Sequence, residues 1–529
     1  MVKKVIICIY LTVFINLLLH AQSPGAIIDV QHYGFTIQLN DQNDTIKGEA
    51  NIAVTFLKDA GSFKIDLVKK KVNGKGMLVS SVTENGANLP FQQDQDAVTV
   101  STQAKSGTEH NYVISYSGIP ADGLIISTNK FGHRTFFGDN WPNRAHNWLP
   151  CVDEPADKAT VDFMVTAPDH YQVVANGLKV EEKTLSGNLK LTHWREKTLC
   201  PTKVMVIGVA DFAIDHAGDV KDIPVYTYVF PENKDKGFAS YAVAKEILAY
   251  YMGKVGSYAF EKLANVQSKT IFGGMENSSC IFYFEESVGD KGIEELMAHE
   301  IAHQWFGDAA SETAFSHLWL SEGFATYMTN VYLEHKYGTD TLKKRLMADR
   351  EMVFDFEKKR KTPVVDTSVH NNYMVLLNPN SYQKGGWVLH MLRRKLGEDA
   401  YWKGIRAYYA KYDGGNANTD NLRAELEKAS GKNLEQFFKQ WIYTAGAPHL
   451  NINWRYNSSK KAVDLTVTQK QAALFDFPLE ISIGGKRQIL LVKNKVTTLS
   501  IPLKVKPSSV IVDPNVNLLA AFDVKEAIQ

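Results

Sequence analysis

Two histidines and two glutamates in one short stretch have the types and the spacing of a metal site. His299 and His303 are four residues apart, and Glu322 follows after eighteen intervening residues. Residues i and i+4 of an α-helix lie on the same face, so both imidazoles can bind one ion. Glu300 stands next to the first histidine, where it can act on a water molecule at that ion. The pattern predicts a zinc site with Glu322 as the third protein ligand.

The segments around these residues follow helical periodicity. Apolar residues recur three and four apart near the histidines, which is typical of a buried amphipathic helix. These residues are Ile293, Leu296, Met297 and Ile301. A second helical pattern begins near Leu318 and carries Glu322. The two-histidine motif alone also arises by chance, and a lone histidine on an apolar face is usually a core residue. What favours a zinc site over these alternatives is the downstream Glu322 on a helix of its own.

Zinc held by two histidines and a glutamate keeps a fourth position for water, which then becomes a nucleophile. Glu300 would take the proton of this water and pass it to the leaving amine. The oxyanion needs a second donor, for which Tyr382 is one candidate among 23 tyrosines. These groups fit peptide or ester hydrolysis. An N-terminal cut also requires a group for a free ammonium. Glu276, beside Gly273 and Gly274, suits this role, as other carboxylates would.

Composition describes an ordinary globular chain without a surplus of charge. Its 529 residues are 44% hydrophobic and 22% charged, and this length suffices for about three domains. The formal net charge is +1. We therefore expect neither nucleic acid nor an anionic membrane surface as a partner. The sequence does not indicate an oligomeric state.

The N-terminus predicts export. Two lysines precede an apolar run from Val5 to Leu19, and Ala21 follows. This pattern is typical of a secretory signal peptide, here residues 1–21. A membrane anchor is the alternative, but the run is short for a span and Asn16 interrupts it. We expect no membrane span after removal of the signal, and a periplasmic or extracellular location.

Three cysteines remain after this cleavage, namely Cys151, Cys200 and Cys280. They are widely spaced and form no metal-ligand pair. An exported protein of this size does not need disulfides for its core. A bridge between Cys151 and Cys200 stays an open alternative.

The periodicity changes twice and divides the chain into three regions. Residues 22–214 alternate apolar and polar positions between turn residues, which predicts a large antiparallel β-domain. Residues 215–447 show apolar spacing of three and four, which predicts a mainly helical domain around the zinc motif. Residues 448–529 return to short alternating strands and predict a small β-sandwich. The predicted fold class is multidomain α+β.

Two segments outside the zinc motif are candidates for lining a site. Phe136–Phe163 is dense in Trp, Pro and Asp, which indicates a structured loop. The strand-like segment 269–287 is broken by Gly273 and Gly274, which allows another backbone to approach closely. A bulge or a plain turn would give the same pattern.

These motifs together resemble the zinc aminopeptidases of the aminopeptidase N type, in the gluzincin family. The resemblance spans nearly the whole chain after the signal. The matching stretches are GGMEN at Gly273–Asn277 (usually Gly-Ala-Met-Glu-Asn), HEIAHQWFG at His299–Gly307, Leu320–Tyr327, and YQKG at Tyr382–Gly385. LPCVDEPADKAT near Cys151 and GNANTDNL further on are weaker likenesses.

The resemblance implies an aminopeptidase that removes the N-terminal residue from peptides with one zinc ion. It implies that His299, His303 and Glu322 bind zinc. It further implies Glu300 as the general base and Tyr382 as the oxyanion donor. The implied substrate-binding residues are Gly273, Gly274, Met275, Glu276 and Asn277, with Glu276 on the free α-amine. The implied fold is a β-saddle domain, a thermolysin-like catalytic domain and a small β-sandwich.

The chain departs from the family pattern at several positions. Gly274 replaces the usual alanine, which should loosen the substrate-binding edge. The family's Gln-x-Glu segment is not evident, and Asp139 is a weak substitute for its amine-binding carboxylate. Asp308 stands where asparagine is frequent. No long helical array follows the last β-region in this sequence, so we expect an open cleft that accepts longer peptides.

Two other functions stay open. A related zinc hydrolase would act as an endopeptidase or an epoxide hydrolase, and a binding protein would use the scaffold without catalysis. Glu300 and Tyr382 argue against the binding protein, which needs neither. The preferred first side chain is not indicated, because apolar residues such as Met275 line most pockets.

Overall fold

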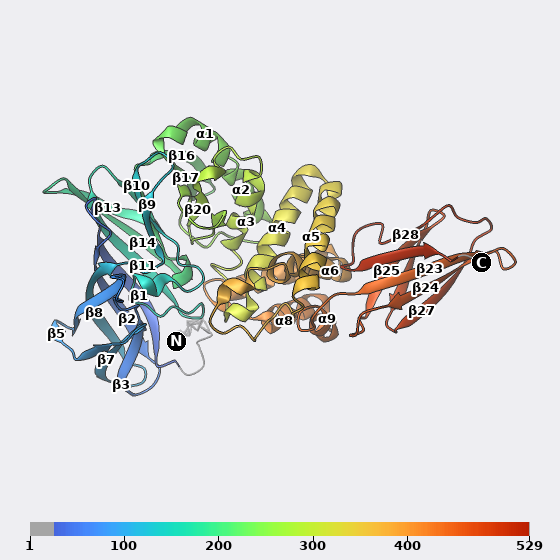
Figure 1. The fold of residues 1–529 in the computed structure, drawn as a ribbon, viewed down its shortest axis with the longest axis horizontal. Coiled ribbons are helices and arrows are strands. Elements are labelled where there is room, and N and C mark those ends of the chain that lie inside the picture. Colours follow the sequence, from blue (N-terminus) through green and yellow to red (C-terminus); the bar gives the residue numbers. More distant parts are fainter. Residues whose placement is uncertain (1–25, 528–529) are drawn as a thin grey trace, which may run out of the picture.

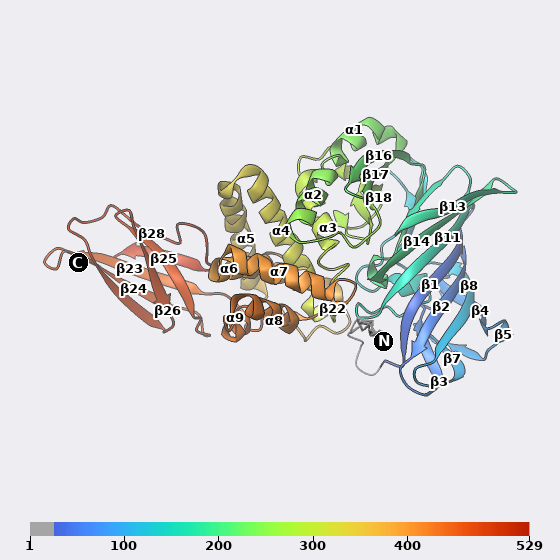
Figure 2. The ribbon, with the colours of Figure 1, turned by 180° about the vertical axis from the view of Figure 1, so that it is seen from behind.

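Three regions of different secondary structure follow one another along the chain (Figure 1). The structure, a computed structural model, describes residues 26–527. Seen from opposite sides, the helical region lies between two β-regions (Figure 1, Figure 2). The predicted signal peptide lies outside the described residues. The α+β architecture predicted from the sequence is confirmed.

The first region combines an eight-stranded sheet with sheets of four and three strands around one apolar core. Strand β1 pairs with β2 antiparallel and with β11 parallel. Its Tyr33, Phe35 and Ile37 alternate onto one face and are fully buried. The strands are β1 (Ile28–Gln38), β2 (Ile46–Phe56), β3 (Ala60–Asp66), β4 (Gly76–Glu84), β5 (Ala87–Asn88), β6 (Phe91–Gln93), β7 (Ala97–Ala104), β8 (Glu109–Ile119), β9 (Leu124–Thr128), β10 (Arg134–Gly138), β11 (Lys158–Pro168), β12 (Gln172–Ala175), β13 (Leu178–Leu185), β14 (Leu189–Pro201) and β15 (Ile207–Ala210).

The second region combines a five-stranded sheet in the order β16-β17-β18-β20-β19 with packed helices, of which α1 and α2 lie between β17 and β18 in the chain. Its strands are β16 (Ala213–Val220), β17 (Ile223–Val229), β18 (Leu263–Ser268), β19 (Gly274–Met275) and β20 (Cys280–Phe284), and a separate short pair is β21 (Ser311–Glu312) with β22 (Asn416–Ala417). Its helices are α1 (Lys234–Tyr241), α2 (Ala244–Lys254), α3 (Ile293–His303), α4 (Trp319–Tyr337), α5 (Thr339–Lys359), the π-helix η7 (Asn380–Lys384), α6 (Gly385–Leu396), α7 (Glu398–Tyr412), α8 (Thr419–Ser430) and α9 (Glu435–Trp441).

The third region is a small sandwich of a four-stranded and a three-stranded sheet. Leu465 and Leu479, one from each sheet, are buried in the same apolar cluster. The strands are β23 (His449–Asn457), β24 (Ala462–Gln469), β25 (Phe477–Ile483), β26 (Lys486–Val492), β27 (Val496–Pro502), β28 (Val510–Val512) and β29 (Ala521–Glu526). Short 3₁₀ turns occur at η1 (Ala145–Asn147), η2 (Thr202–Val204), η3 (Pro231–Asn233), η4 (Glu285–Ser287), η5 (Phe315–His317) and η6 (Tyr373–Leu376).

The loop predicted at Phe136–Phe163 is shorter than expected. Its ends belong to strands β10 and β11, and only the residues between them are irregular. Every residue from Thr135 to Gly138 is buried, so β10 lacks the alternation that marks a half-exposed strand. The prediction was wrong at the ends of the segment for this reason.

Buried charges join the first region to the second. The Lys158 ammonium, on β11, donates hydrogen bonds to the carbonyls of Asp308, Ala309 and Gly415. Burial lowers the pKa of Lys158 to about 8. Lys203 forms a buried ion pair with Glu312. These contacts fix the start of β11 and the turn η2 against residues 308–312, which follow α3.

Two further features of the described residues concern export and redox state. Cys151, Cys200 and Cys280 are buried and free, so the structure holds no bridge between Cys151 and Cys200. Among residues 26–527, no helix combines the length and the apolar character that crossing a membrane requires.

Candidate active site

Helices α3 and α4 bring the three predicted zinc ligands together. His299 and His303 project from one face of α3, and Glu322 lies in the first turn of α4. The two Nε2 atoms are 3.2 Å apart. The Glu322 Oε2 atom is 3.4 Å from His299 Nε2 and 3.3 Å from His303 Nε2. Three donor atoms therefore converge on one point.

This donor set fits zinc. Ligand bonds of 2.0–2.1 Å in a tetrahedron give ligand-to-ligand distances of about 3.3–3.4 Å, close to those found. Glu322 Oε2 is buried and has no hydrogen-bond partner among the described residues, as an atom reserved for an ion would be. Among the described residues, a second cluster that could hold a metal consists of Glu276, Glu300 and His303, so the two clusters have His303 in common.

The surroundings of His303 orient it toward the same point. Its Nδ1 lies 3.2 Å from the carbonyl oxygen of Phe306 and 2.9 Å from the Ser321 hydroxyl. A carbonyl only accepts, so the proton of the ring belongs on Nδ1. The Nε2 lone pair is then free for a metal.

Carboxylates dominate the electrostatics of the site. Burial acts to lower the pKa of His303, but Glu322 and Glu276 outweigh it and raise the pKa to about 10. Burial acts to raise the pKa of Glu322, but the two histidines hold it well below its usual range. Burial raises the pKa of Glu300 well above normal, with neighbouring Glu276 acting in the same direction. A site that favours a protonated imidazole so strongly also favours a divalent cation.

The glycine-rich edge lies beside the metal ligands. Strand β19 pairs antiparallel with β20, with Gly274 opposite Tyr283 and Met275 opposite Phe282. Glu276 follows directly and is buried, and its Oε1 has no hydrogen-bond partner among the described residues. A Cβ on Gly274 would collide with the Glu300 carboxylate. The glycine in place of the family's alanine therefore gives the side chain of Glu300 room.

Gln304 ties this edge to the zinc helix. Its Nε2 donates to the carbonyl oxygen of Glu276 at 2.5 Å and to Asp308 Oδ2 at 2.8 Å. Its Oε1 accepts from the backbone N–H of Ser279 at 2.7 Å. Both ends of one buried amide thus fix the position of Glu276 relative to α3.

Tyr382 reaches the site from the π-helix η7. Its ring stacks on that of His299 with centroids 6.0 Å apart and planes at 8°. Burial, together with Glu322 and Glu276, raises its pKa well above normal. The phenol therefore keeps its proton and can donate it in a hydrogen bond.

A cavity of about 280 Å³ contains these groups. Predicted residues that line it are Gly273, Gly274, Met275, Glu276, His299, Glu300, His303, Glu322 and Tyr382. Asn277, which follows Glu276 in the chain, does not line it and is fully buried. Asp139 does not line the cavity either; it is buried nearby and accepts hydrogen bonds from Arg144 and the backbone N–H of Ile271.

Four lining residues were not predicted individually as site residues: Trp141, Phe272, Leu296 and Leu377. Trp141 and Phe272 lie in the two segments that the sequence indicated as candidates for lining a site, 136–163 and 269–287. Leu296 was predicted only as an apolar position of a helix, and Leu377 looks like an ordinary core residue in the sequence.

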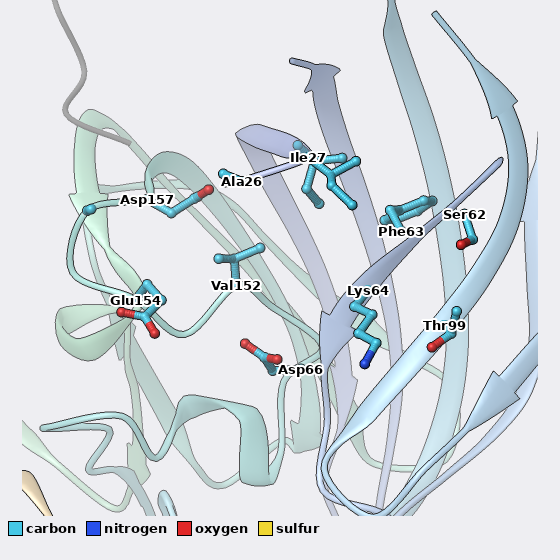
Figure 3. Close-up of a pocket in the computed structure, with 12 residues that line it drawn as sticks. Ala26, Ile27, Ser62, Phe63, Lys64, Asp66, Thr99, Val152, Glu154 and Asp157 are labelled. Atoms are coloured by element: carbon cyan, nitrogen blue, oxygen red, sulfur yellow. The ribbon is translucent and has the colours of Figure 1, made fainter. Parts of the chain in front are cut away.

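A second cavity, of about 350 Å³, lies in the first β-region. Figure 3 shows Asp66, Glu154 and Asp157 around it, together with Ile27 and Phe63. These carboxylates are not among the groups of described residues close enough to share an ion. The smaller cavity, which contains the histidines and the convergent donors, is therefore the candidate active site.

Comparison with known families agrees with this geometry. A model of the peptidase family M1 domain matches residues 240–441, and a model of the peptidase M1 N-terminal domain matches residues 29–204. The first match contains the three ligands, Glu300 and Tyr382. The second contains the loop that carries Trp141.

Relatives of known name are larger proteins. The chain is 26% identical to probable aminopeptidase 2 of Sulfurisphaera tokodaii over 92% of this chain and 63% of that one. It is 25% identical to leucyl aminopeptidase of Saccharolobus solfataricus, over 87% and 59%. The chain thus spans about three fifths of the length of these relatives.

The fold is also that of a solved structure. Aminopeptidase A of Legionella pneumophila, solved in complex with aspartic acid, matches with a TM-score of 0.82 at 17% identity, over 96% of this chain and 61% of that one. Two models of one family match successive regions of the chain, and the fold agrees. The chain therefore belongs to peptidase family M1, the family of the aminopeptidase N type.

Proposed function

We propose that this protein is a zinc aminopeptidase that removes the N-terminal residue from peptides. One observation carries the proposal: a His-His-Glu donor set, a buried free carboxylate at Glu276 and the phenol of Tyr382 line a single cavity. A general hydrolase needs the donor set and a base. A carboxylate beside an exposed strand edge adds a group for the free ammonium of a peptide.

Each residue of the site has a separate role in the proposed reaction. His299, His303 and Glu322 would hold zinc, which when bound polarises the substrate carbonyl and lowers the pKa of water. Glu300 takes the proton of the attacking water and passes it to the leaving amine. Tyr382 donates its hydroxyl proton in a hydrogen bond to the oxyanion that develops on the carbonyl.

The glycine-rich edge positions the substrate. Glu276 pairs with the α-ammonium, which fixes how many residues precede the cleaved bond. The backbone of Gly273, Gly274 and Met275 offers hydrogen bonds to an extended peptide, as an added strand would use. The peptide bond is then held next to Glu300 and the metal ligands.

We propose one zinc ion per chain. Among residues 26–527, the two clusters of acidic and histidine side chains that could hold a metal share His303, so both cannot hold an ion with a complete ligand set. Elemental analysis of the purified protein should find one mole of zinc per mole of chain. A ratio of two would contradict the proposal.

A panel of aminoacyl fluorogenic amides tests the activity. We expect cleavage of amides with a free amine, loss of cleavage after N-acetylation, and loss after treatment with a zinc chelator. Cleavage that survives acetylation would contradict the exopeptidase assignment. Absence of any cleavage with zinc bound would favour a binding protein.

Two variants separate metal binding from proton transfer. Glu300→Ala should keep zinc and lose turnover, because it removes the base and no ligand. Glu322→Ala should lower zinc content itself. If Glu300→Ala retained turnover, the role proposed for Glu300 would be wrong.

We also propose that the chain is exported. The support is the N-terminal pattern alone, whose residues lie outside those described. Mass determination of the protein from its native host should find cleavage near Ala21, and an uncleaved chain in the membrane fraction would favour the anchor.

A further inference from the structure

The active-site cavity has an apolar wall that the proposed chemistry does not use. Apart from the groups assigned to the metal, the base, the oxyanion and the amine, its lining residues are apolar or glycine. They are Trp141, Phe272, Gly273, Gly274, Met275, Leu296 and Leu377. Among the described residues, no lysine or arginine lines this cavity.

Trp141 and Phe272 form one rigid corner of this wall. Their rings meet edge to face, with centroids 6.0 Å apart and planes at 89°. The indole also packs against Phe315 at 6.3 Å and is 2% exposed. Edge-to-face packing on two sides fixes the plane of the indole.

Charged groups near this corner are occupied. Arg144 is paired with Asp139 and Asp122. Its guanidinium lies 5.9 Å from the Phe272 ring centroid and does not line the cavity. Asp139 also accepts a hydrogen bond from the backbone N–H of Ile271 at 2.9 Å. Neither charge is available to a substrate side chain.

We infer that Trp141 and Phe272 are specificity-determining residues, and that the corner they form binds the first side chain of the substrate and selects apolar and aromatic ones. This inference rests on the proposed function, because Glu276 must hold the α-ammonium for the first side chain to lie at this wall. A charged side chain would lose its hydration there without gaining a partner. An apolar side chain gains from burial.

Matched amides that differ only in the first residue test the selection. We expect kcat/KM for Leu, Met and Phe amides to exceed that for Glu and Lys amides by at least about a hundredfold, as expected for a charge buried without a partner. Equal rates for charged and apolar residues would overturn the inference and leave the proposed function intact. Failure of every amide would instead contradict the proposed function.

Variants at the corner test the two residues. Trp141→Ala should lower kcat/KM for Phe and Leu amides by about ten- to hundredfold and change the Ala amide by less than about threefold, because only large side chains reach the wall. An equal loss for all amides would mean that Trp141 has a structural role. Phe131→Leu, at an exposed phenylalanine that does not line the cavity, is the control.

If Trp141→Ala folds poorly, two further variants still test the inference. The Trp141 indole N–H has no hydrogen-bond partner among the described residues, so Trp141→Phe removes no bond and should fold and keep the apolar preference. Phe272→Arg places a cation at the wall and should raise the ratio of Glu to Leu cleavage at least about tenfold. An unchanged ratio in a folded, zinc-loaded Phe272→Arg variant would overturn the assignment of Phe272.

Discussion

Tyr382 is the residue whose removal should separate catalysis from binding. It stacks on His299, a proposed metal ligand, and keeps its proton, so its hydroxyl is placed to act when the oxyanion forms. Tyr382→Phe should lower kcat by about 10²- to 10³-fold, the effect of one lost oxyanion donor. KM and zinc content should change little, because the hydrogen bond belongs to the transition state.

Steady-state kinetics with zinc analysis measures this effect. The exposed Tyr443 offers a matched control, since Tyr443→Phe removes the hydroxyl of a residue that does not line the cavity. A raised KM at constant kcat would place Tyr382 in substrate binding instead.

Ser321 should govern how tightly zinc binds. Its hydroxyl lies 2.9 Å from His303 Nδ1 and helps to hold the ring in its metal-binding orientation. Ser321→Ala should weaken zinc binding by about 10- to 100-fold, as loss of outer partners does at other sites. Competition with a chelator of known affinity measures it, with Ser430→Ala on α8 as the control. Unchanged affinity would show that the Phe306 carbonyl alone orients His303.

The sequence allowed prediction of residues whose spacing is set by a helix. His299 and His303 had to share a face once α3 formed, and Glu322 followed on the next helical pattern. Ser321 and Gln304 could not be predicted, because their roles depend on distances between segments. Trp141 is far from the zinc motif in sequence, so only the folded chain places it in the cavity.

Helix α4 and the start of α6 lie backbone to backbone where Gly323 of α4 faces Gly385 of α6. A Cβ on Gly323 would lie 2.9 Å from the Cα of Gly385 and 3.1 Å from the carbonyl oxygen of Ser381. Gly323→Ala must therefore push α4 away from η7, which carries Tyr382. We expect a loss of about 1–3 kcal/mol in the free energy of unfolding, and a lower kcat.

Urea unfolding and steady-state kinetics together test this packing. Gly253→Ala on α2 is the matched control, because nothing lies within 4 Å of its Cβ position. That control should be neutral or gain about 0.4–1 kcal/mol. Full activity in a Gly323→Ala variant would mean that η7 adjusts independently of α4.

Helix α6 should make stability depend on pH through His390. Burial, with Arg394 and Arg393 nearby, lowers the pKa of His390 to about 3. The unfolded chain takes up this proton near pH 6.5 and the folded chain does not until about pH 3. The contribution of His390 to stability should therefore be full well above pH 6.5, begin to fall near pH 6.5, and decrease by about 1.4 kcal/mol per pH unit well below it.

The comparison of wild type with His390→Gln isolates this contribution. Asp349 and Asp513 act in the opposite direction, because burial raises the pKa of each to about 6. The difference in unfolding free energy between wild type and variant should shrink by about 1 kcal/mol between pH 6.5 and 5.5, because the unfolded His390 is already half protonated at pH 6.5. A difference independent of pH would mean that His390 is protonated in the folded protein.

Elements with clear periodicity could be predicted from the sequence. Helices α3 and α4 and the alternating strands of both β-regions follow their patterns, whereas the fully buried β10 did not. The π-helix η7 also gave no pattern of its own. Its form depends on contacts with α4 and α5, and these contacts cannot be predicted from the sequence pattern.

At the scale of the whole molecule, the cavity draws on two regions. Trp141 comes from the first β-region, and the ligands come from the second. The buried contacts of Lys158 and the Lys203–Glu312 pair hold these regions together. Sequence patterns located each region separately but not their junction, since such contacts join residues more than 100 positions apart.

A groove adjoins the active-site cavity. The groove has a volume of about 660 Å³. Leu296, His299 and Tyr382 line both the groove and the active-site cavity, whereas Glu276 lines only the cavity. It runs along α5, where Ala348 and Met352 are exposed. If Glu276 holds the first residue, the groove is in place for residues beyond the cleaved bond.

The groove predicts how activity depends on peptide length. Wild type should cleave dipeptides and decapeptides with the same first residue at similar rates, because the groove admits the remainder of the chain. Ala348→Trp should fill the groove and raise KM about tenfold for decapeptides, equivalent to about 1.4 kcal/mol of lost contact. Dipeptides, which do not reach α5, should be unaffected, and Ala424→Trp on exposed α8 controls for the added indole. A steep fall in wild-type rate with length, or an equal effect of Ala348→Trp on both substrates, would contradict this use of the groove.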